Sequence, residues 1–194
     1  MKKINFEKLI NHSTILYGEI NTKKTLYTAK FLKFLLEKKK ITPENITILD
    51  FAPKLKIIEG MKIGGRIYDY YKYNQSCIAP KIENEIIPPR LKSSNKKDLC
   101  KNALHNYNIT QQLLEYYNEF PTKVLLINDI SIYLHLGNRK FFLDSINKSK
   151  TFLGNIYYGD SIGKKEIFSL FNLKEKKYAD NLIKKANYSF HLTK

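Results

Sequence analysis

The chain has 194 residues, of which 43% are hydrophobic, including 14 tyrosines and 11 phenylalanines. This size and apolar content exclude a disordered tail, because the chain can bury enough apolar surface to offset its conformational entropy, and they favour one folded domain over residues 1–194. The 34 Lys and Arg residues against 18 Asp and Glu residues give a formal net charge of +16, which indicates a polyanionic partner.

The same charge has a second explanation. Lysine is spread along the whole chain and the arginines are few, namely Arg66, Arg90 and Arg139, as AT-biased coding would produce. A nucleic-acid-binding surface should instead concentrate its cations on one face. Nucleic acid therefore remains an alternative partner.

Two further features concern the cellular compartment. Asn5, Glu7 and Lys8 interrupt any apolar signal sequence, and no window approaches the roughly 18 apolar residues of a membrane span. Cys77 and Cys100 have no cysteine or histidine partner at zinc-ligand spacing. We therefore expect a cytoplasmic protein with reduced cysteines and no membrane partner.

A strand and a helix begin the predicted fold. Residues 14–17 are apolar and end at Gly18, which is typical of a buried strand. Apolar residues then recur at helical spacing, at Leu26, Ala29, Leu32 and Leu36. Pro43 prevents this helix from continuing.

A second strand is predicted over residues 46–50, and it ends in the carboxylate of Asp50. Residues 52–93, called the insertion below, lack strong periodicity and are punctuated by glycine and proline. Only residues 76–79 look extended and apolar. A segment of this kind is typical of a functional loop or a small irregular insertion.

The rest of the chain alternates helices with strands. Helices are predicted over 95–119, 139–147 and 174–185, and strands over 124–127, 151–157 and 188–191. This alternation indicates a parallel sheet covered on both faces. The predicted fold class is therefore α/β, a three-layer αβα sandwich with a mostly parallel central sheet of about five strands.

The segment between the first strand and the first helix matches most of a phosphate-binding motif. Gly18, Lys24 and Thr25 stand where G-x-x-x-x-G-K-[ST] has its first glycine, its lysine and its hydroxyl. In such a loop, backbone N–H groups surround phosphate oxygens, the lysine reaches the terminal phosphates and the hydroxyl binds Mg²⁺. Lys23 replaces the second glycine. If the fold requires a positive φ there, lysine costs about 1 to 2 kcal/mol relative to glycine.

Such a loop is a degenerate Walker A motif. Together with the order of strands and helices, it resembles the P-loop NTPase superfamily, and within it the additional-strand division of recombinase-like and AAA-like ATPases. In that division a carboxylate associated with Mg²⁺ ends the third strand, and residues 124–129 (Val-Leu-Leu-Ile-Asn-Asp) look like that Walker B motif. The likeness covers most of the chain except residues 52–93. The combination of Gly18-Glu19, Lys24-Thr25, Leu49-Asp50-Phe51-Ala52-Pro53 and Gly64-Gly65 also resembles uncharacterised archaeal ATP-binding proteins.

The resemblance implies ATP and Mg²⁺ as ligands. Lys24 would contact the β- and γ-phosphates, Thr25 would coordinate Mg²⁺, and Asp129 would hold that ion through water. The nucleotide-binding residues would be Gly18, Glu19, Ile20, Asn21, Thr22, Lys23, Lys24, Thr25 and Leu26. Ile130 stands where the division often has a water-activating glutamate, with Ser131 and Asp160 as loose substitutes. The resemblance is thus compatible with slow hydrolysis or with binding alone.

Other residues have alternative interpretations. Asp50 could face the site as a further Mg²⁺ ligand, or it could cap the turn before Pro53. The Gly-Gly-Arg and tyrosine residues of 64–73 could bind a substrate or a nucleic acid, or they could form a Tyr-rich strand or hairpin. Arg139 could stabilise phosphate charge, or it could form a salt bridge at a helix start. The strand-end residues Asn155, Tyr157 and Tyr158 could sense the γ-phosphate or have no ligand.

The predicted function is that of a nucleotide-binding P-loop protein, a weak ATPase or a nucleotide-dependent switch that binds ATP and Mg²⁺. Two alternatives remain open. One is a basic nucleic-acid-binding module on a P-loop scaffold that has lost nucleotide hydrolysis, and the other is a small-molecule kinase or transferase whose acceptor pocket is formed by residues 52–93. A homo-oligomer is compatible with the sequence, which defines no symmetric interface.

Overall fold

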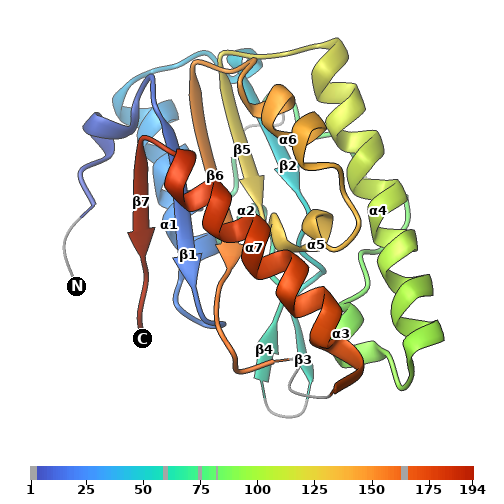
Figure 1. Ribbon diagram of the computed structural model, residues 1–194. Coiled ribbons are helices and arrows are strands. Elements are labelled where there is room, and N and C mark those ends of the chain that lie inside the picture. Colours follow the sequence, from blue (N-terminus) through green and yellow to red (C-terminus); the bar gives the residue numbers. More distant parts are fainter. Residues whose placement is uncertain (1–3, 59–60, 74–75, 82, 163–165) are drawn as a thin grey trace.

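A computed structural model describes residues 4–58, 61–73, 76–81, 83–162 and 166–194. Its centre is a five-stranded sheet in the order β2-β5-β6-β1-β7 (Figure 1), and every pairing within that sheet is parallel. The strands are β1 (Ser13–Gly18), β2 (Ile46–Asp50), β5 (Val124–Asn128), β6 (Thr151–Tyr157) and β7 (Tyr188–His191). Each of them coincides with a predicted strand to within one residue at either end.

The register of the sheet brings distant polar residues to one edge. Gly18 at the end of β1 pairs with Tyr157, and Asp50 at the end of β2 pairs with Asn128. Because parallel strands all end on the same side, these residues lie along the lower edge of the sheet in Figure 1.

Helices cover both faces of the sheet. One face carries α1 (Lys24–Lys33), its π-helical extension Phe34–Lys38 and the short α2 (Ile67–Tyr70), and the other carries α4 (Lys96–Glu119), α5 (Ser131–Leu134), α6 (Arg139–Ile146) and α7 (Ser169–Lys185). Successive strand residues point to opposite faces, so that Ile15 packs against the α4–α7 side and Leu16 against α1. The α/β class and the helix-flanked parallel sheet are confirmed, and the arrangement is consistent with a three-layer sandwich.

One helix is longer than its pattern indicates. α7 begins at Ser169, whereas the periodicity predicts a start at residue 174. The added turn contains Leu170 and Leu173, which are 76% and 67% exposed. Apolar side chains that face solvent do not produce the buried stripe from which a helix is predicted.

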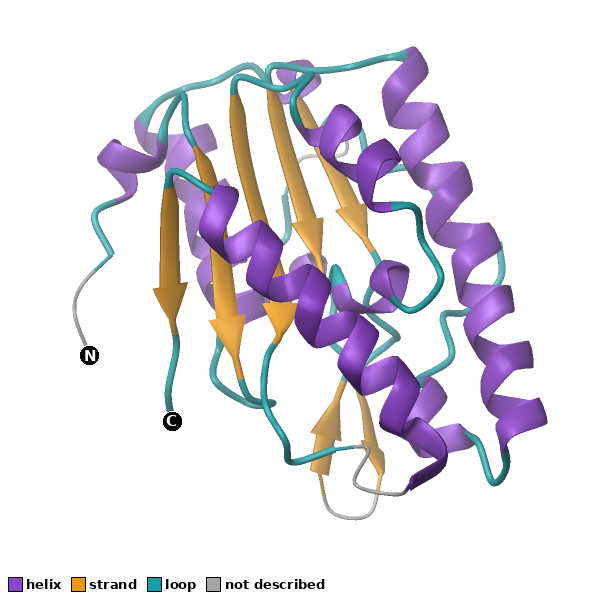
Figure 2. Cartoon of the chain, viewed as in Figure 1, coloured by secondary structure: helices purple, strands orange, loops and turns teal. Residues whose placement is uncertain are grey.

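The insertion contains more regular structure than its sequence indicates. Strands β3 (Lys56–Ile58) and β4 (Met61–Ile63) form an antiparallel pair below the sheet in Figure 2, and α3 spans Pro89–Lys92. Residues 59–60, 74–75 and 82 of the insertion lie outside the described part of the chain. Ile78, in the segment predicted to be extended, bonds the edge of β2, because Ile48 N–H donates to its carbonyl at 2.8 Å and its own N–H donates to Ile46 O at 3.0 Å.

The prediction of a Tyr-rich strand or hairpin over 68–73 is wrong. Residues 67–70 form α2 instead, because two carboxylates cap the start of that helix. Asp69 accepts from Arg66 N–H at 2.7 Å, and Asp50 accepts from Ile67 N–H at 2.7 Å. Local capping therefore overrides the β-propensity of the tyrosines.

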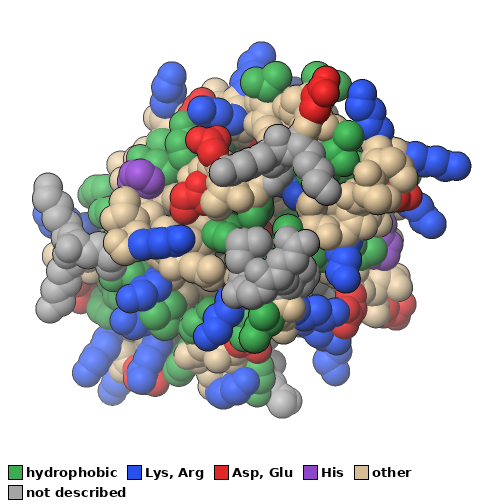
Figure 3. Space-filling view, turned by 90° about the horizontal axis from the view of Figure 1, so that it is seen from below, with side chains coloured by type: hydrophobic (Ala, Val, Ile, Leu, Met, Phe, Trp, Pro, Cys, Tyr) green, Lys and Arg blue, Asp and Glu red, His purple; other side chains and the backbone are tan. Residues whose placement is uncertain are grey.

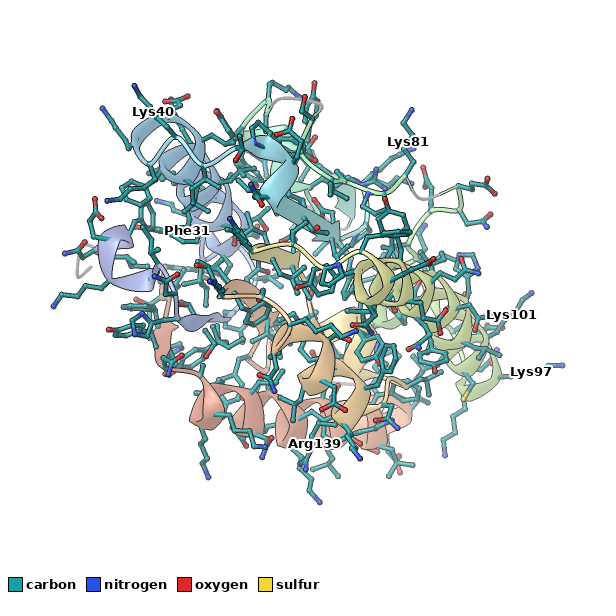
Figure 4. The ribbon with its side chains drawn as sticks, turned by 90° about the horizontal axis from the view of Figure 1, so that it is seen from above. Phe31, Lys40, Lys81, Lys97, Lys101 and Arg139 are labelled. Carbon is teal, nitrogen blue, oxygen red and sulfur yellow. The ribbon has the colours of Figure 1, made fainter. Side chains whose placement is uncertain are left out.

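The cations of the chain lie on several sides of the molecule. The residues labelled in Figure 4 show this: Lys40 follows α1, Lys97 and Lys101 extend from α4, and Lys81 lies in the insertion, whereas Phe31 is fully buried. These positions do not define one basic face. Within the described ranges, no helix combines the length and the apolar composition needed to cross a bilayer.

Short 3-10 turns complete the described structure, at Phe6–Leu9, Pro43–Asn45 and Glu166–Phe168.

Candidate functional site

The loop between β1 and α1, residues 18–25, turns sharply through left-handed backbone conformations. The φ angles are +144° at Gly18, +60° at Asn21 and +65° at Lys23. A side chain at Gly18 would clash with the chain, because its Cβ would lie 2.2 Å from the carbonyl oxygen of Leu192. Left-handed residues next to right-handed ones direct successive N–H groups into a concavity that binds anions. The positive φ angles at Asn21 and Lys23 are compatible with such a concavity.

Lys23 adopts the positive φ that its sequence position predicts. It is the residue before α1, and no side-chain hydrogen bond caps the helix there. The left-handed conformation costs a residue with a Cβ about 1 to 2 kcal/mol. At this position the chain thus combines a positive φ with a long side chain.

Lys23→Gly is expected to raise the free energy of unfolding by about 1 kcal/mol, because glycine adopts this conformation without strain. Reversible urea denaturation measures the difference. Lys30→Gly, on the exposed side of α1, is the matched control, and it should lower stability by about 1 kcal/mol because glycine disfavours a helix interior. Destabilisation of equal size by both substitutions would contradict strain at Lys23.

Lys24 folds back into the concavity of the loop. Its Nζ donates to the carbonyl oxygens of Gly18 at 2.8 Å and Glu19 at 2.5 Å, and to Thr22 Oγ1 at 3.3 Å. Burial lowers the pKa of Lys24 to about 8, although the charges of Asp129 and Glu19 oppose this shift. The ammonium is therefore held where it can exchange carbonyl partners for phosphate oxygens.

Glu19 was predicted to bind nucleotide, and its carboxylate contacts the segment after β6. It accepts from the N–H groups of Asp160 at 2.6 Å and Ser161 at 3.0 Å, and from the Ser161 hydroxyl. Burial alone would raise the pKa of Glu19, but these hydrogen bonds lower it below its ordinary value. The side chain fastens the loop to the neighbouring strand end.

A network of buried amides connects the strand ends. Asn128 is fully buried, and its Oδ1 accepts from the Thr25 hydroxyl at 3.1 Å and from Asn155 Nδ2 at 2.7 Å. Its Nδ2 donates to Asp50 Oδ1 at 2.7 Å and to Gly65 O at 3.0 Å. The amide thus uses both its donor and its acceptor capacity. The sequence interpretation chose Asp129 and missed Asn128, although Asn128 is the polar residue that directly ends the apolar strand.

Asp129 lies next to this network and lines a cavity. Its φ is +57°, its N–H donates to Asn155 Oδ1 at 3.0 Å, and the residue lines the cavity described below. Burial, and next the negative charge of Glu175, raises the pKa of Asp129 to about 7, whereas Lys24 lowers it. A cation in the cavity would relieve this repulsion.

Asp50 was interpreted either as a Mg²⁺ ligand or as a cap of the backbone. The contacts of its carboxylate fit the cap. Its carboxylate accepts from the N–H groups of Ala52 at 3.4 Å and Ile67 at 2.7 Å, as well as from Asn128. Burial raises the pKa of Asp50 to about 6 in spite of these bonds. Asp50 does not line the cavity and holds the insertion against the sheet.

The cavity lies at the lower edge of the sheet between the 18–25 loop and the insertion, and its volume is about 160 Å³. Loop residues 20–25 form one wall, whereas Gly18, Glu19 and Leu26 do not line it. The opposite wall is largely apolar and includes Pro53, Ile63, Pro88, Pro89, Leu91 and Ile132. Figure 3 shows this edge, where hydrophobic side chains lie among Lys and Arg side chains.

A buried ion pair adjoins the cavity through Arg90, which lines it. The Arg90 guanidinium pairs with Glu175 through Nη2 and donates from Nε to Asn172 Oδ1 at 2.9 Å. His135 Nε2 lies 3.6 Å from the same Glu175 carboxylate. The pKa of Glu175 is below its ordinary value, because His135 and Arg90 outweigh the effect of burial. Arg139, the arginine chosen from the sequence, is exposed on α6 and does not line the cavity.

The residues around the cavity fit a nucleotide-bound Mg²⁺ ion. The Thr25 hydroxyl and the Asp129 carboxylate both line it, and hard oxygen ligands of this kind suit Mg²⁺. Within the described ranges, no three His, Cys, Asp or Glu side chains form a metal-binding group. The ion would therefore take most of its ligands from phosphate oxygens and water, as Mg²⁺ does in nucleotide sites.

No protein-family model and no curated protein matches the sequence at a significant level.

Proposed function

We propose that the chain binds ATP with Mg²⁺ at the 18–25 loop and acts as a slow ATPase or a nucleotide-dependent switch of the P-loop type. One observation carries the proposal. The loop has left-handed turns at Asn21 and Lys23, and it is followed by Lys24 in its concavity and by Thr25, whose hydroxyl contacts Asn128 at the end of β5. A helix N-terminus, an ammonium and a Mg²⁺-binding hydroxyl thus meet at one point, as phosphate binding requires.

The order of the strands supports the same proposal. β6 lies between β1, which precedes the loop, and β5, which ends at Asn128. The parallel register brings the residues of both motifs to one edge of the sheet. In this assignment Lys24 binds the β- and γ-phosphates, Thr25 coordinates Mg²⁺ and Asp129 holds the ion through water.

Slow hydrolysis follows from the residues around the cavity. Among the described residues that line it, Asp129 is the only carboxylate, so that one group would have to attract the metal and orient the water. Ile130 is fully buried, and the Ser131 hydroxyl oxygen accepts from Tyr157 N–H at 2.8 Å. Asp160 does not line this cavity.

Equilibrium titration of Mg-ATP against the wild type and Lys24→Met tests the proposed nucleotide binding.

The affinity for Mg-ATP is expected to rise between about pH 6 and pH 7.5 and to fall above about pH 8. Asp129 must be ionised to attract the metal, and burial raises its pKa to about 7. Lys24 must be protonated to bind phosphate, and burial lowers its pKa to about 8. Isothermal titration at several pH values measures the profile.

Asp129→Asn separates the contribution of this residue from the titration of ATP itself. The substitution should flatten the rise of the Mg-ATP affinity between about pH 6 and pH 7.5 and leave its fall above about pH 8 unchanged. Asp160→Asn, which changes an exposed carboxylate, is the control and should keep both limbs. An unchanged acid limb in Asp129→Asn would remove Asp129 from the metal site.

A further inference from the structure

The cavity also has polar side chains from outside the 18–25 loop. Arg90 from α3, Ser131 from α5 and Tyr157 from β6 line the same cavity as loop residues 20–25, and Tyr157 is the strand partner of Gly18. The Arg90 guanidinium lies 5.7 Å from the centre of the Tyr157 ring, and Tyr157 N–H donates to Ser131 Oγ at 2.8 Å. These three residues, called the Arg90 cluster, therefore lie together.

The Arg90 cluster consists of hydrogen-bond donors. The hydroxyl oxygen of Ser131 accepts from Tyr157 N–H, and the Tyr157 hydroxyl oxygen accepts from Ile162 N–H at 3.2 Å. The Ser131 hydroxyl thus accepts a bond, which leaves its proton for another acceptor, whereas the Tyr157 hydroxyl also contacts the Ser161 side chain and would exchange that partner for a ligand. Arg90 uses Nη2 and Nε for its bonds to Glu175 and Asn172, and Nη1 makes no hydrogen bond with the described residues. The group that complements this cluster is an acceptor.

Arg90 is fixed in place before any ligand arrives. The side chains of Arg90 and Glu175 are 6% and 4% exposed, and Glu175 belongs to α7, which packs beside α3 at the lower right of Figure 1. A guanidinium held on two sides binds an oxygen ligand with little loss of side-chain entropy. Glu175 offsets part of the Arg90 charge, so the cluster should bind an oxyanion with moderate affinity.

We propose that Arg90, Ser131 and Tyr157 form an oxyanion site for a phosphate group, next to the 18–25 loop and in the same cavity. Two sources would supply that group: the terminal phosphate of the nucleotide, or the phosphate of a second molecule bound beside it. The inference rests on the proposed function in one respect, namely that a nucleotide binds next to the Arg90 cluster. The contacts within the cluster do not depend on that function.

The test uses the full chain, two substitutions and one control. Arg90→Lys keeps the charge and removes the planar donor fork, and Tyr157→Phe removes one hydroxyl without touching the ion pair. Tyr158→Phe is the matched control, because that hydroxyl donates to Asp180 at 2.9 Å and the residue does not line the cavity. Titrations measure the dissociation constants of Mg-ADP, of the β,γ-imido analogue of Mg-ATP, and of inorganic phosphate with and without that analogue.

If the cluster takes the terminal phosphate, the imido analogue should bind the wild type more tightly than Mg-ADP. This preference should fall about tenfold in Arg90→Lys and about threefold in Tyr157→Phe, as expected for the loss of a charge-assisted and a neutral hydrogen bond. If it takes a second molecule, inorganic phosphate should bind while the analogue is present, and the same substitutions should weaken that binding. Tyr158→Phe should behave as the wild type in both experiments.

The proposal is overturned if inorganic phosphate does not bind beside the analogue and the preference for the analogue over Mg-ADP is the same in all four proteins. Failure of the proposed function has a different signature, since then neither nucleotide binds the wild type. In that case phosphate titration of the nucleotide-free chain decides: saturable binding that Arg90→Lys weakens supports the oxyanion site, and its absence rejects it.

Discussion

Lys24→Met is expected to lower the affinity for Mg-ATP by about 100-fold, because hydrogen bonds from a charged donor contribute about 1.5 to 3 kcal/mol and each 1.4 kcal/mol is a factor of ten. The Lys24 ammonium stands at the centre of the 18–25 loop, where Gly18 O, Glu19 O and Thr22 Oγ1 are its present partners. Phosphate oxygens would replace these acceptors. Methionine keeps much of the side-chain length and removes only the donor, and isothermal titration measures the loss.

Lys30→Met is the control for this substitution. Lys30 belongs to the same helix and is exposed, so its replacement makes the same change of charge at a distance from the loop. Its affinity for Mg-ATP should stay within about twofold of the wild type. A wild-type affinity in Lys24→Met, or an equal loss in both variants, would contradict phosphate binding by Lys24.

Asn128→Ala lowers the free energy of unfolding by about 3 kcal/mol, because it leaves several buried polar groups without partners. The amide connects Thr25, Asp50, Asn155 and the carbonyl of Gly65, and it is fully buried. For a chain of this size the loss corresponds to a fall of about 10 °C in Tm. Thermal and urea denaturation measure both quantities.

Two further substitutions distinguish the amide network from burial in general. Asn147→Ala removes an exposed asparagine after α6 and should change stability by less than about 0.5 kcal/mol. Asn128→Asp should destabilise the fold as well, since it places a second carboxylate against Asp50 and loses the donor to Gly65 O. A stability equal to that of the wild type in Asn128→Ala would show that the network contributes little.

Much of the fold follows from the sequence, because the strands are mostly apolar segments. Residues 14–17, 124–127 and 151–157 are almost entirely buried, and such strands need no help from distant residues to be recognised. The position of the 18–25 loop, between a strand and a helix, is predicted for a related reason, because the residues that indicate it are neighbours in sequence. Its role in phosphate binding stays a prediction.

The rest depends on contacts between distant segments. Arg90 is held at the cavity by Glu175, which lies 85 residues further along the chain. No local sequence pattern predicts a pair so far apart. The two strands of the β3–β4 hairpin have three residues each, which is too short for a periodic signal. Asn128 was missed because its role is defined by Asp50 and Gly65, and the folded sheet and insertion bring these residues to it.

Lys23 stands at the position where the phosphate-binding motif has its second glycine. The residue keeps a φ of +65°, the conformation for which the motif has glycine. Lysine is strained there, yet the neighbouring strand and helix hold the loop in place. A sequence pattern that demands glycine would reject this chain, whereas the backbone geometry retains the turn.

The proposed binding of Mg-ATP is tested most directly by a titration of the purified chain with a fluorescent ATP analogue, with and without Mg²⁺, followed by competition with ATP, ADP and GTP. We expect saturable micromolar binding that requires Mg²⁺, that ATP reverses and that Lys24→Met weakens about 100-fold. No saturable binding by the wild type up to millimolar analogue would contradict it, and would mean that the 18–25 loop has the shape of a phosphate site without the activity.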